Sequence, residues 1–181
     1  MPSDTRRRLD LDRFIPYRLS VLSNRVSSAI AGEYSERFGL TIPEWRVMAV
    51  LGGTPDLSAR EVAERTAMDK VQVSRAVARL IRSKRLERDT DGRDGRVRRL
   101  KLSRAGRAIY DEIVPLALEL EERFLSVLTV EERRALNGLI EKLSRELGAL
   151  LTVERLKLPF AVGLEREKPP KSRGVISADA P

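Results

Sequence analysis

The sequence predicts a mainly helical protein with a small β-hairpin, arranged as a winged helix-turn-helix between long N- and C-terminal helices. Apolar residues recur at helical spacing on both sides of a central segment. That segment contains two short helix signatures, followed by two short strand-like runs around a turn-rich loop. Residues 58–104 also carry 15 Lys and Arg against 7 Asp and Glu, and this surplus equals the net charge of +8 of the whole chain. A compact basic segment of this kind favours a partner with a phosphate backbone, namely double-stranded DNA.

The amino-acid composition argues against several classes of function. The 181 residues, of which 41% are hydrophobic, suit one domain with arms. The chain has no Cys and no His, which removes disulfides, thiolate metal sites and the usual general base. No carboxylate pair stands in a context that would raise its pKa for acid–base work, so we expect no enzyme, no cofactor and no metal. There is no apolar run of transmembrane length, which leads us to expect a cytoplasmic protein without a membrane partner.

The first helix is predicted over residues 11–38 and ends at Gly39. Its apolar side steps by three and four residues through Ile15, Leu19, Leu22, Val26, Ile30 and Tyr34. A second, short helix follows the capping-box pair Thr41 and Glu44, and its inner side is expected to hold Trp45, Met48 and Leu51.

The helix-turn-helix pair comes next. Ser58 and Glu61 form another capping box, and the helix that they begin runs to Thr66. After a tight turn, Asp69 caps a second helix whose inner side carries Val73, Ala76, Val77 and Leu80. The opposite side of this helix is therefore polar, small and positive, as a reading helix requires.

A hairpin is predicted from strands at residues 86–88 and 97–102, because the loop between them is rich in Asp and Gly. Its tip exposes Arg93 and Arg96 beside acidic neighbours, and its returning strand carries Arg98, Arg99 and Lys101. Helix, turn, helix and hairpin together predict the winged module over residues 41–104.

Two more helices are predicted within residues 103–151, the first containing Pro115 and the second beginning at Thr129 with Glu132. The expected organisation is a basic arm at 1–10, a domain at 11–151 and a C-terminal tail at 152–181. The helices at 11–38 and 103–151 are expected to pack against a second copy, because the winged module alone is too small to bury both of their apolar stripes. Such a homodimer would present two reading helices to a palindromic operator.

Residues 57–107 resemble the MarR family of bacterial transcription regulators, and the layout agrees over about residues 14–151. The resemblance lies in the segments 69–75, 91–96 and 100–106, above all in the D-x-R-D-x-R wing followed by L-x-L-S-x-x-G. It implies a homodimer with the helix from Asp69 to about Ser83 in the major groove and the wing in the minor groove. Many members are repressors that small aromatic or phenolic compounds release, so a ligand-responsive repressor is expected.

The predicted DNA contacts fall into three groups. Base edges are expected to be read by Gln72, Ser74 and Arg75. Phosphates are expected to be neutralised by Lys70, Arg79, Arg82, Arg98, Arg99 and Lys101. In the wing, Arg93 belongs to the charged tip, and the resemblance assigns Arg96 to the minor groove with Asp94 steadying it. The alternatives are merely solvated charges and, for the whole chain, a non-specific or architectural DNA-binding protein.

The resemblance also points to an effector pocket near Tyr17, Arg18, Trp45 and Met48, although Trp45 and Met48 at helical spacing equally suit a core. One departure from the family is Arg85, where members usually carry a Gly that closes the reading helix in a left-handed conformation. We expect this substitution to affect the direction of the wing. The missing Cys and His set the chain apart from thiol-oxidation and zinc-responsive members.

Overall fold

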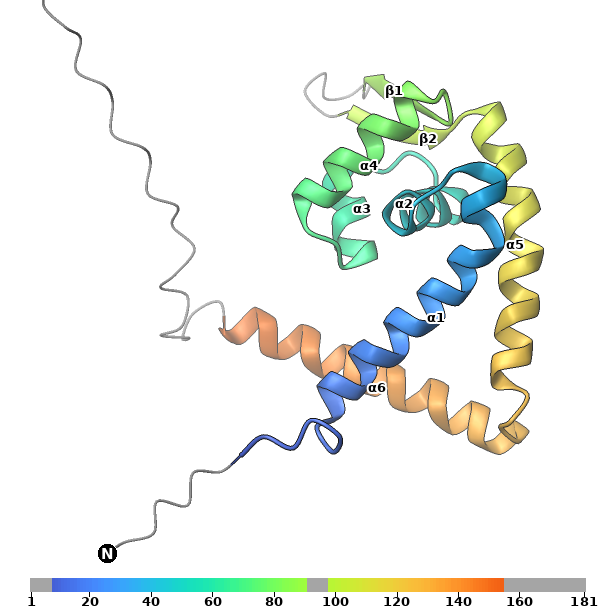
Figure 1. Ribbon diagram of the computed structural model, residues 1–181. Coiled ribbons are helices and arrows are strands. Elements are labelled where there is room, and N and C mark those ends of the chain that lie inside the picture. Colours follow the sequence, from blue (N-terminus) through green and yellow to red (C-terminus); the bar gives the residue numbers. More distant parts are fainter. Residues whose placement is uncertain (1–7, 91–97, 155–181) are drawn as a thin grey trace, which may run out of the picture. The chain divides into compact units, whose positions relative to one another are not determined.

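The computed structural model describes residues 8–90 and 98–154. Their elements are, in chain order, α1 (Ile15–Phe38), α2 (Ile42–Gly53), α3 (Ala59–Thr66), α4 (Lys70–Arg82), β1 (Leu86–Thr90), β2 (Arg98–Leu102), α5 (Arg104–Leu125) and α6 (Val130–Glu154) (Figure 1). The fold is thus mainly helical with one antiparallel hairpin, which confirms the predicted winged helix-turn-helix class. The chain divides into two compact units between Val127 and Leu128, so that α6 is described by itself.

Helix α1 begins later than the sequence pattern predicted. Residues 11–13 form a turn, with the Arg13 amide donating to the Asp10 carbonyl at 3.2 Å, and the helix starts at Ile15 with Pro16 in its first turn. Proline favours the first turn because its missing N–H has no intrahelical partner there. The predicted end is confirmed, since Gly39 adopts φ 60° and donates to the Ser35 carbonyl.

Side-chain caps start the short helices where the sequence placed them. The Ser58 hydroxyl accepts from the Glu61 amide at 3.2 Å, and the Glu61 carboxylate accepts from the Ser58 amide at 2.7 Å. One Asp69 carboxylate oxygen accepts the amides of Val71 and Gln72, both at 2.8 Å. These bonds satisfy amides that have no partner within their own helix.

The hairpin pairs Leu86 with Leu102, Arg88 with Leu100 and Thr90 with Arg98. Strand β1 therefore runs two residues further than predicted, and the segment 91–97 lies outside the described residues. Strand β2 also forms a bridge to Leu57, whose carbonyl accepts the Leu100 amide at 2.8 Å. This bridge attaches the hairpin to the segment that precedes α3.

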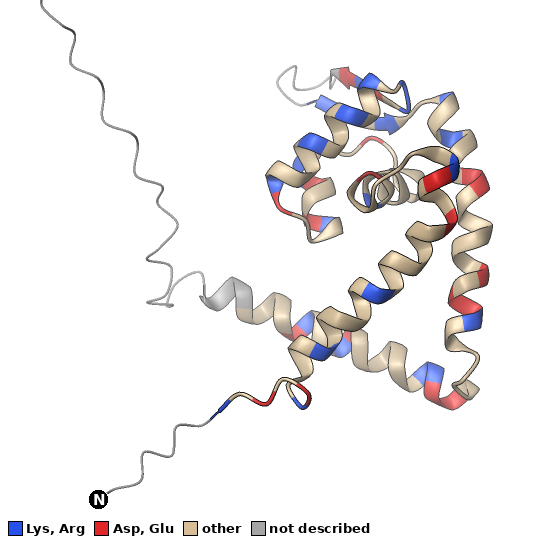
Figure 2. Ribbon diagram, viewed as in Figure 1, with Lys and Arg blue, Asp and Glu red and all other residues tan. Residues whose placement is uncertain are grey.

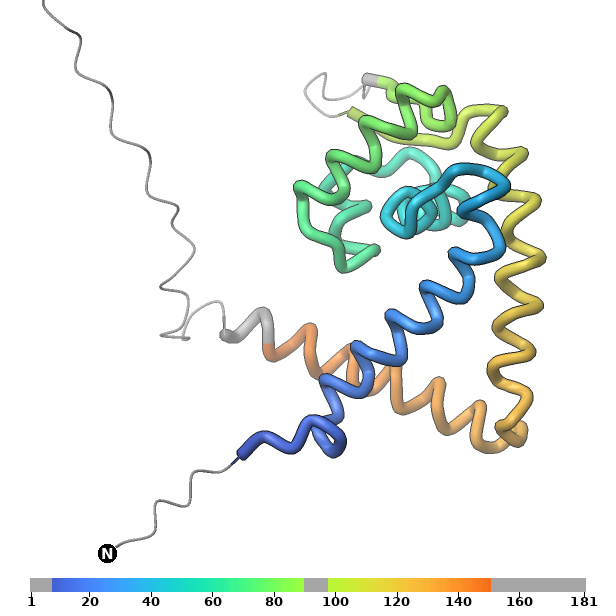
Figure 3. The backbone as a smooth tube through the Cα atoms, in the orientation of Figure 1, coloured from blue at the N-terminus to red at the C-terminus, as the bar shows by residue number. Residues whose placement is uncertain are grey.

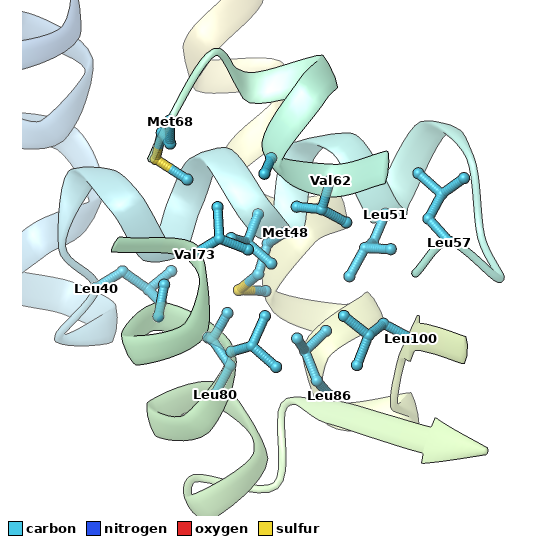
Figure 4. Close-up of a cluster of buried hydrophobic side chains, with 14 of the residues drawn as sticks. Leu40, Met48, Leu51, Leu57, Val62, Met68, Val73, Leu80, Leu86 and Leu100 are labelled. Carbon is cyan, nitrogen blue, oxygen red and sulfur yellow. The ribbon is translucent and has the colours of Figure 1, made fainter. Parts of the chain in front are cut away.

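Most of the core lies between α2, α3, α4 and the hairpin, a group of elements that we call the winged lobe (residues 40–102) (Figure 4). Tyr34 of α1 and Ile113 of α5 complete the core. The predicted inner face of α4 is confirmed, because its four apolar residues are each at most 2% exposed. Burial of one aliphatic side chain of this size contributes about 1.5–3 kcal/mol. This packing fixes the rotation of α4 and thereby decides which side chains it presents outward.

Helices α1 and α5 each meet the winged lobe at one end, α1 at its C-terminus and α5 at its N-terminus (Figure 3). Helix α5 continues through Pro115, and the Ser103 hydroxyl caps it by accepting the Gly106 amide at 3.0 Å. Helix α6 begins after Thr129, whose hydroxyl accepts the Glu132 amide as predicted. None of the helices in the described part of the chain is long and apolar enough to cross a membrane.

Candidate nucleic-acid interface

Basic residues gather on the winged lobe and on the adjoining start of α5. Figure 2 shows Lys and Arg along α4, on the hairpin strands and on the first turn of α5. Among the residues that the structure describes, no group of three or more His, Cys, Asp or Glu could hold a metal ion. The candidate site is therefore a basic surface, and α4 forms its centre.

The predicted base-reading residues share the outward side of α4. Gln72, Ser74 and Arg75 are all exposed, while Val73 between them is buried. Within residues 8–90 and 98–154, no ion pair or hydrogen bond engages these three side chains. Their donors and acceptors are thus available to a ligand, and an exposed Arg or Gln can make two hydrogen bonds to one base edge.

The predicted phosphate contacts on α4 are Lys70 at its start and Arg79 and Arg82 in its last turn, and all three are exposed. Arg79 differs from the other two, because its Nε lies 3.9 Å from Oε1 of the buried Glu44. The other oxygen of Glu44 accepts the amide and the hydroxyl of Thr41 at 2.8 and 2.6 Å. Arg79 therefore also links α4 to the start of α2, a contact that the sequence pattern did not reveal.

Arg99 on β2 has partners within the lobe. Its Nη1 donates to Oε2 of Glu61 at 3.0 Å and lies 3.4 Å from the Asp56 carbonyl. Hydrogen bonds from Ser58 are the main cause of the lowered pKa of Glu61, and the charge of Arg99 lowers that pKa further. Arg99 thus anchors the hairpin to the start of α3, besides any contact that it makes with a phosphate.

Lys101 is also paired, since its Nζ lies 2.6 Å from Oδ2 of Asp89 and 3.8 Å from Oε2 of Glu87. The hydrogen bond to Asp89 is the main cause of its raised pKa. Both partners come from the opposite strand, where Glu87 is directly paired with Lys101. The strand register could have revealed this contact, had the length of β1 been predicted correctly.

Of the remaining predicted wing residues, one lies within the part of the chain that the structure describes. Arg98 is exposed at the start of β2, opposite Thr90. Arg93, Asp94 and Arg96, which the sequence places at the tip, lie outside the described residues.

The four predicted effector residues do not come together within one chain. Tyr17 and Arg18 are exposed and line a shallow hollow along the first turns of α1. Met48 is fully buried, and Trp45 packs between the rings of Tyr34 and Tyr110, with ring centroids 5.6 and 6.0 Å away. Tyr17 and Tyr34 are 17 positions apart on the same helix, which corresponds to roughly 26 Å. The alternative that Trp45 and Met48 serve the core is thus the better description.

Tyr34 was not singled out as a site residue in the sequence, and it is the most unusual polar group of the core. It is fully buried, and its hydroxyl has no hydrogen-bond partner among the described residues. Burial raises its pKa to about 12. Tyr34 is the last residue of the predicted apolar side of α1, and that pattern does not indicate whether its hydroxyl has a partner.

The expectation for Arg85 is wrong in one respect. The left-handed residue between α4 and β1 is Lys84, with φ 57°, and Arg85 itself has no positive φ. The left-handed turn between α4 and β1 therefore lies one residue earlier than the sequence led us to expect, at a residue other than glycine.

Comparisons with known proteins agree with this geometry. A sequence model described as the MarR family matches residues 38–97. The crystal structure of a probable transcriptional regulator from Pseudomonas aeruginosa superposes with a TM-score of 0.64 at 30% identity, covering 74% of this chain and 99% of that one.

Two further similar proteins have more specific descriptions. The HTH-type transcriptional repressor Rv2887 of Mycobacterium tuberculosis is 25% identical over 134 residues, which cover 74% of this chain and 93% of that protein. BpsR of Bordetella bronchiseptica, whose DNA binding is regulated by 6-hydroxynicotinic acid, superposes with a TM-score of 0.67 at 25% identity, covering 76% of this chain and 97% of that one.

Proposed function

The chain belongs to the MarR family of transcription regulators, which bind DNA, and on that premise we propose that it binds a palindromic operator sequence-specifically as a homodimer. The exposed face of α4 is the observation that carries the proposal. Gln72 and Arg75 have no partner among the described residues, and the buried side of the same helix fixes their direction. A rigid helix with free bidentate donors suits the major groove, where each base pair presents a distinct pattern.

The other cations of the lobe position the duplex. Lys70 and Arg82 lie at the two ends of α4, where they can each neutralise a phosphate on either side of the bases that α4 reads. Arg98 extends the same role to the hairpin. For the wing tip, the proposal follows the family resemblance: Arg96 enters the minor groove, steadied by Asp94, beside Arg93.

Exposed apolar side chains support the homodimer. Helix α6 carries a row of large aliphatic residues that are between 37% and 59% exposed: Leu136, Leu139, Ile140, Leu143, Leu147 and Leu150. The first turns of α1 expose Ile15, Tyr17, Leu19 and Leu22 in the same way. Contiguous apolar surface on a helix that is otherwise charged is typical of a protein interface. A two-fold dimer would give two reading helices, which is the symmetry of a palindromic operator.

Repression with release by a small aromatic or phenolic effector is the mode of control that we assign. Support comes from the similar repressor of M. tuberculosis and from BpsR, whose DNA binding responds to an aromatic acid. In this chain, Tyr17 and Arg18 supply an aromatic ring and a cation beside one hollow. A ligand that prefers one spacing of the reading helices by about 1–3 kcal/mol changes operator affinity five- to roughly hundredfold.

The reading role of α4 is tested by Arg75→Ala on a duplex that the purified protein selects from genomic fragments. Loss of a bidentate base contact should cost about 1–3 kcal/mol there and relax specificity at one position. Arg82→Ala is the matched control, since it removes a cation from the same helix but should weaken selected and random duplexes alike. Equal losses on both duplexes for Arg75→Ala would contradict base reading and favour the alternative, a non-specific architectural DNA-binding protein.

The effector is tested by measuring operator binding across a panel of phenolic acids and 6-hydroxynicotinic acid. Binding should weaken for at least one compound, and Arg18→Ala should reduce that response without changing operator affinity in its absence. Operator affinity that stays constant across the panel would exclude this class of effector.

A further inference from the structure

Arg85 contacts three helix ends from one position between α4 and β1. Its backbone amide donates to the Leu80 carbonyl in the last turn of α4 at 2.8 Å. Its carbonyl accepts the amide of Ser103, the residue that caps α5, at 3.0 Å. Its guanidinium Nη2 donates to the carbonyl of Phe38, the last residue of α1, at 2.6 Å. The residue therefore connects the C-terminus of α4 with both long helices of its unit.

The contact with α1 has the chemistry of a helix C-cap. The last carbonyls of a helix have no intrahelical donor, and they carry the negative end of the helix dipole. Gly39 donates to the Ser35 carbonyl, and the Arg85 guanidinium supplies a charged donor to Phe38. A half-buried hydrogen bond with a charged donor is stronger than a neutral one. Arg85 thus holds the end of α1 from a position 47 residues further along the chain.

The same turn is fixed from the side of α5. A side-chain carbon at Gly106 would lie 2.0 Å from the Arg85 carbonyl oxygen, so the two backbones are in direct contact. The Ser103 hydroxyl also donates to the Lys84 carbonyl at 2.7 Å. The turn between α4 and β1 consequently cannot shift by itself, because both α1 and α5 hold it.

We infer that Arg85 is a positioning residue for DNA binding: it fixes the C-terminal end of α4 to the end of α1, so that a displacement of α1 moves the reading face. This inference rests on the proposed function, in which α4 reads bases and α1 contributes to the dimer. The left-handed residue of this turn is Lys84, so Arg85 makes the connection without a positive φ of its own.

The test compares Arg85→Ala and Arg85→Lys with Arg82→Ala, which removes an exposed cation from the last turn of α4. The probes are the duplex selected by the wild-type protein and a random duplex of equal length, each at several salt concentrations. Arg85→Ala should lose about tenfold on the selected duplex and little on the random one, because only a fraction of the molecules would then hold α4 in the orientation that reads bases. Its salt dependence should match that of the wild type, whereas Arg82→Ala should flatten the slope by about one. Arg85→Lys retains one charged donor and should recover part of the affinity.

A second readout does not require DNA. Hydrogen exchange of the amides at residues 35–40 should become faster in Arg85→Ala, because the last turn of α1 loses its cap, and should stay unchanged in Arg82→Ala. Fluorescence of Trp45, the single Trp of the chain, verifies that each variant is folded. If Arg85→Ala does not fold, Arg85→Lys carries the test with the same directions.

The outcomes separate this inference from the proposed function. A salt slope that falls by one in Arg85→Ala would make Arg85 a phosphate contact and overturn the positioning role. Unchanged selectivity in Arg85→Ala would also overturn it, whether or not hydrogen exchange at the end of α1 becomes faster. A wild-type protein that does not prefer any duplex would contradict the proposed function instead, and hydrogen exchange would then still decide whether Arg85 holds α1.

Discussion

Helices α4 and α6 have similar apolar periodicity but different surroundings. In α4, Val73, Val77 and Leu80 are at most 1% exposed, because the winged lobe covers them. In α6, Leu143 and Leu147 are each 56% exposed. The periodic pattern indicates which side of a helix is apolar, and it does not indicate what covers that side. For α4 the cover is this chain, and for α6 we propose that it is a second copy.

Helix α1 is covered at its C-terminal end and exposed at its N-terminal end. Tyr34 near its C-terminus is fully buried against the winged lobe, whereas Leu19 and Leu22 near its N-terminus are 49% and 45% exposed. An ion pair between Arg37 and Glu112 of α5 lies at the buried end. The helix therefore joins a covered region to an uncovered one, and the positioning role that we propose for Arg85 concerns its covered end.

The largest expected effect follows from placing a charge on the exposed apolar row of α6. Leu143→Glu should weaken dimerisation at least hundredfold, about 3 kcal/mol, because it would bury an unpaired carboxylate at the centre of the interface. Sedimentation analysis measures the dissociation constant, and operator affinity should fall with it. Lys142→Glu is the control, since this neighbour belongs to the polar side. Dimers of equal stability in both variants would contradict the role of the α6 face.

Helices α5 and α6 should also respond differently when one of their glycines is replaced by alanine. Gly106→Ala places a carbon 2.0 Å from the Arg85 carbonyl oxygen and should lower the free energy of unfolding by about 1–3 kcal/mol. Gly138→Ala in α6 has no atom within 4 Å of the new carbon and should instead raise helix stability by about 0.5–1 kcal/mol. Thermal unfolding measures both changes. A loss of similar size at Gly138 would show that its side of α6 is already covered.

A smaller effect would show whether Arg99 anchors the hairpin or contacts a phosphate. Arg99→Ala and Glu61→Gln should each weaken operator binding by at most about 1 kcal/mol, because an exposed ion pair contributes no more than that to holding the hairpin in place. Their effects should not add, because they break the same contact. Titrations with both single variants and the double variant measure this coupling. Full additivity, with a flatter salt slope for Arg99→Ala, would make Arg99 a phosphate contact alone.

The smallest effect concerns the buried hydroxyl of the covered region. Tyr34→Phe should leave stability near pH 7 unchanged or raise it by up to about 1 kcal/mol, because it removes a buried polar group without a partner. The folded state raises the pKa of Tyr34 from 10 to about 12, so the unfolded state loses this proton first. Stability of the wild type should therefore fall as the pH rises through this window, by more than that of the variant.

Denaturant titrations between pH 9 and pH 12 compare the two proteins. Tyr110→Phe, which changes a half-buried ring against Trp45, controls for the loss of any tyrosine. Identical pH profiles for the wild type and Tyr34→Phe would show that the Tyr34 hydroxyl is solvated in the folded state.

Local signals in the sequence predicted most of the fold. The caps at Ser58, Asp69 and Thr129 were correct because a cap requires only residues within one turn of the helix. The start of α1 was placed too early, since apolar residues continue upstream of Ile15, where the helix begins. Strand β1 was placed too short, because its last residues are polar and depend on pairing with β2.

The candidate site was predictable where it follows from the core. The outward side of α4 is the complement of its buried side, so Gln72 and Arg75 could be identified from periodicity alone. The partners of Arg99 and Arg85 come from residues 38 and 47 positions away, and no pattern within one element reveals them. Tyr17 and Met48 were grouped into one pocket on the family resemblance, and no pattern in the sequence indicated how far apart they lie.

The most direct test of the central claim is a competition measurement with the wild-type protein. The duplex that it selects from genomic fragments competes with a random duplex and with a version of itself that has one half-site scrambled, all at one salt concentration. We predict a bound dimer that prefers the selected duplex over the random one by a factor of about a thousand or more, with an intermediate affinity for the half-scrambled duplex. Equal affinity for all three duplexes, or binding as a monomer, would contradict the claim that two copies of α4 read a palindromic operator.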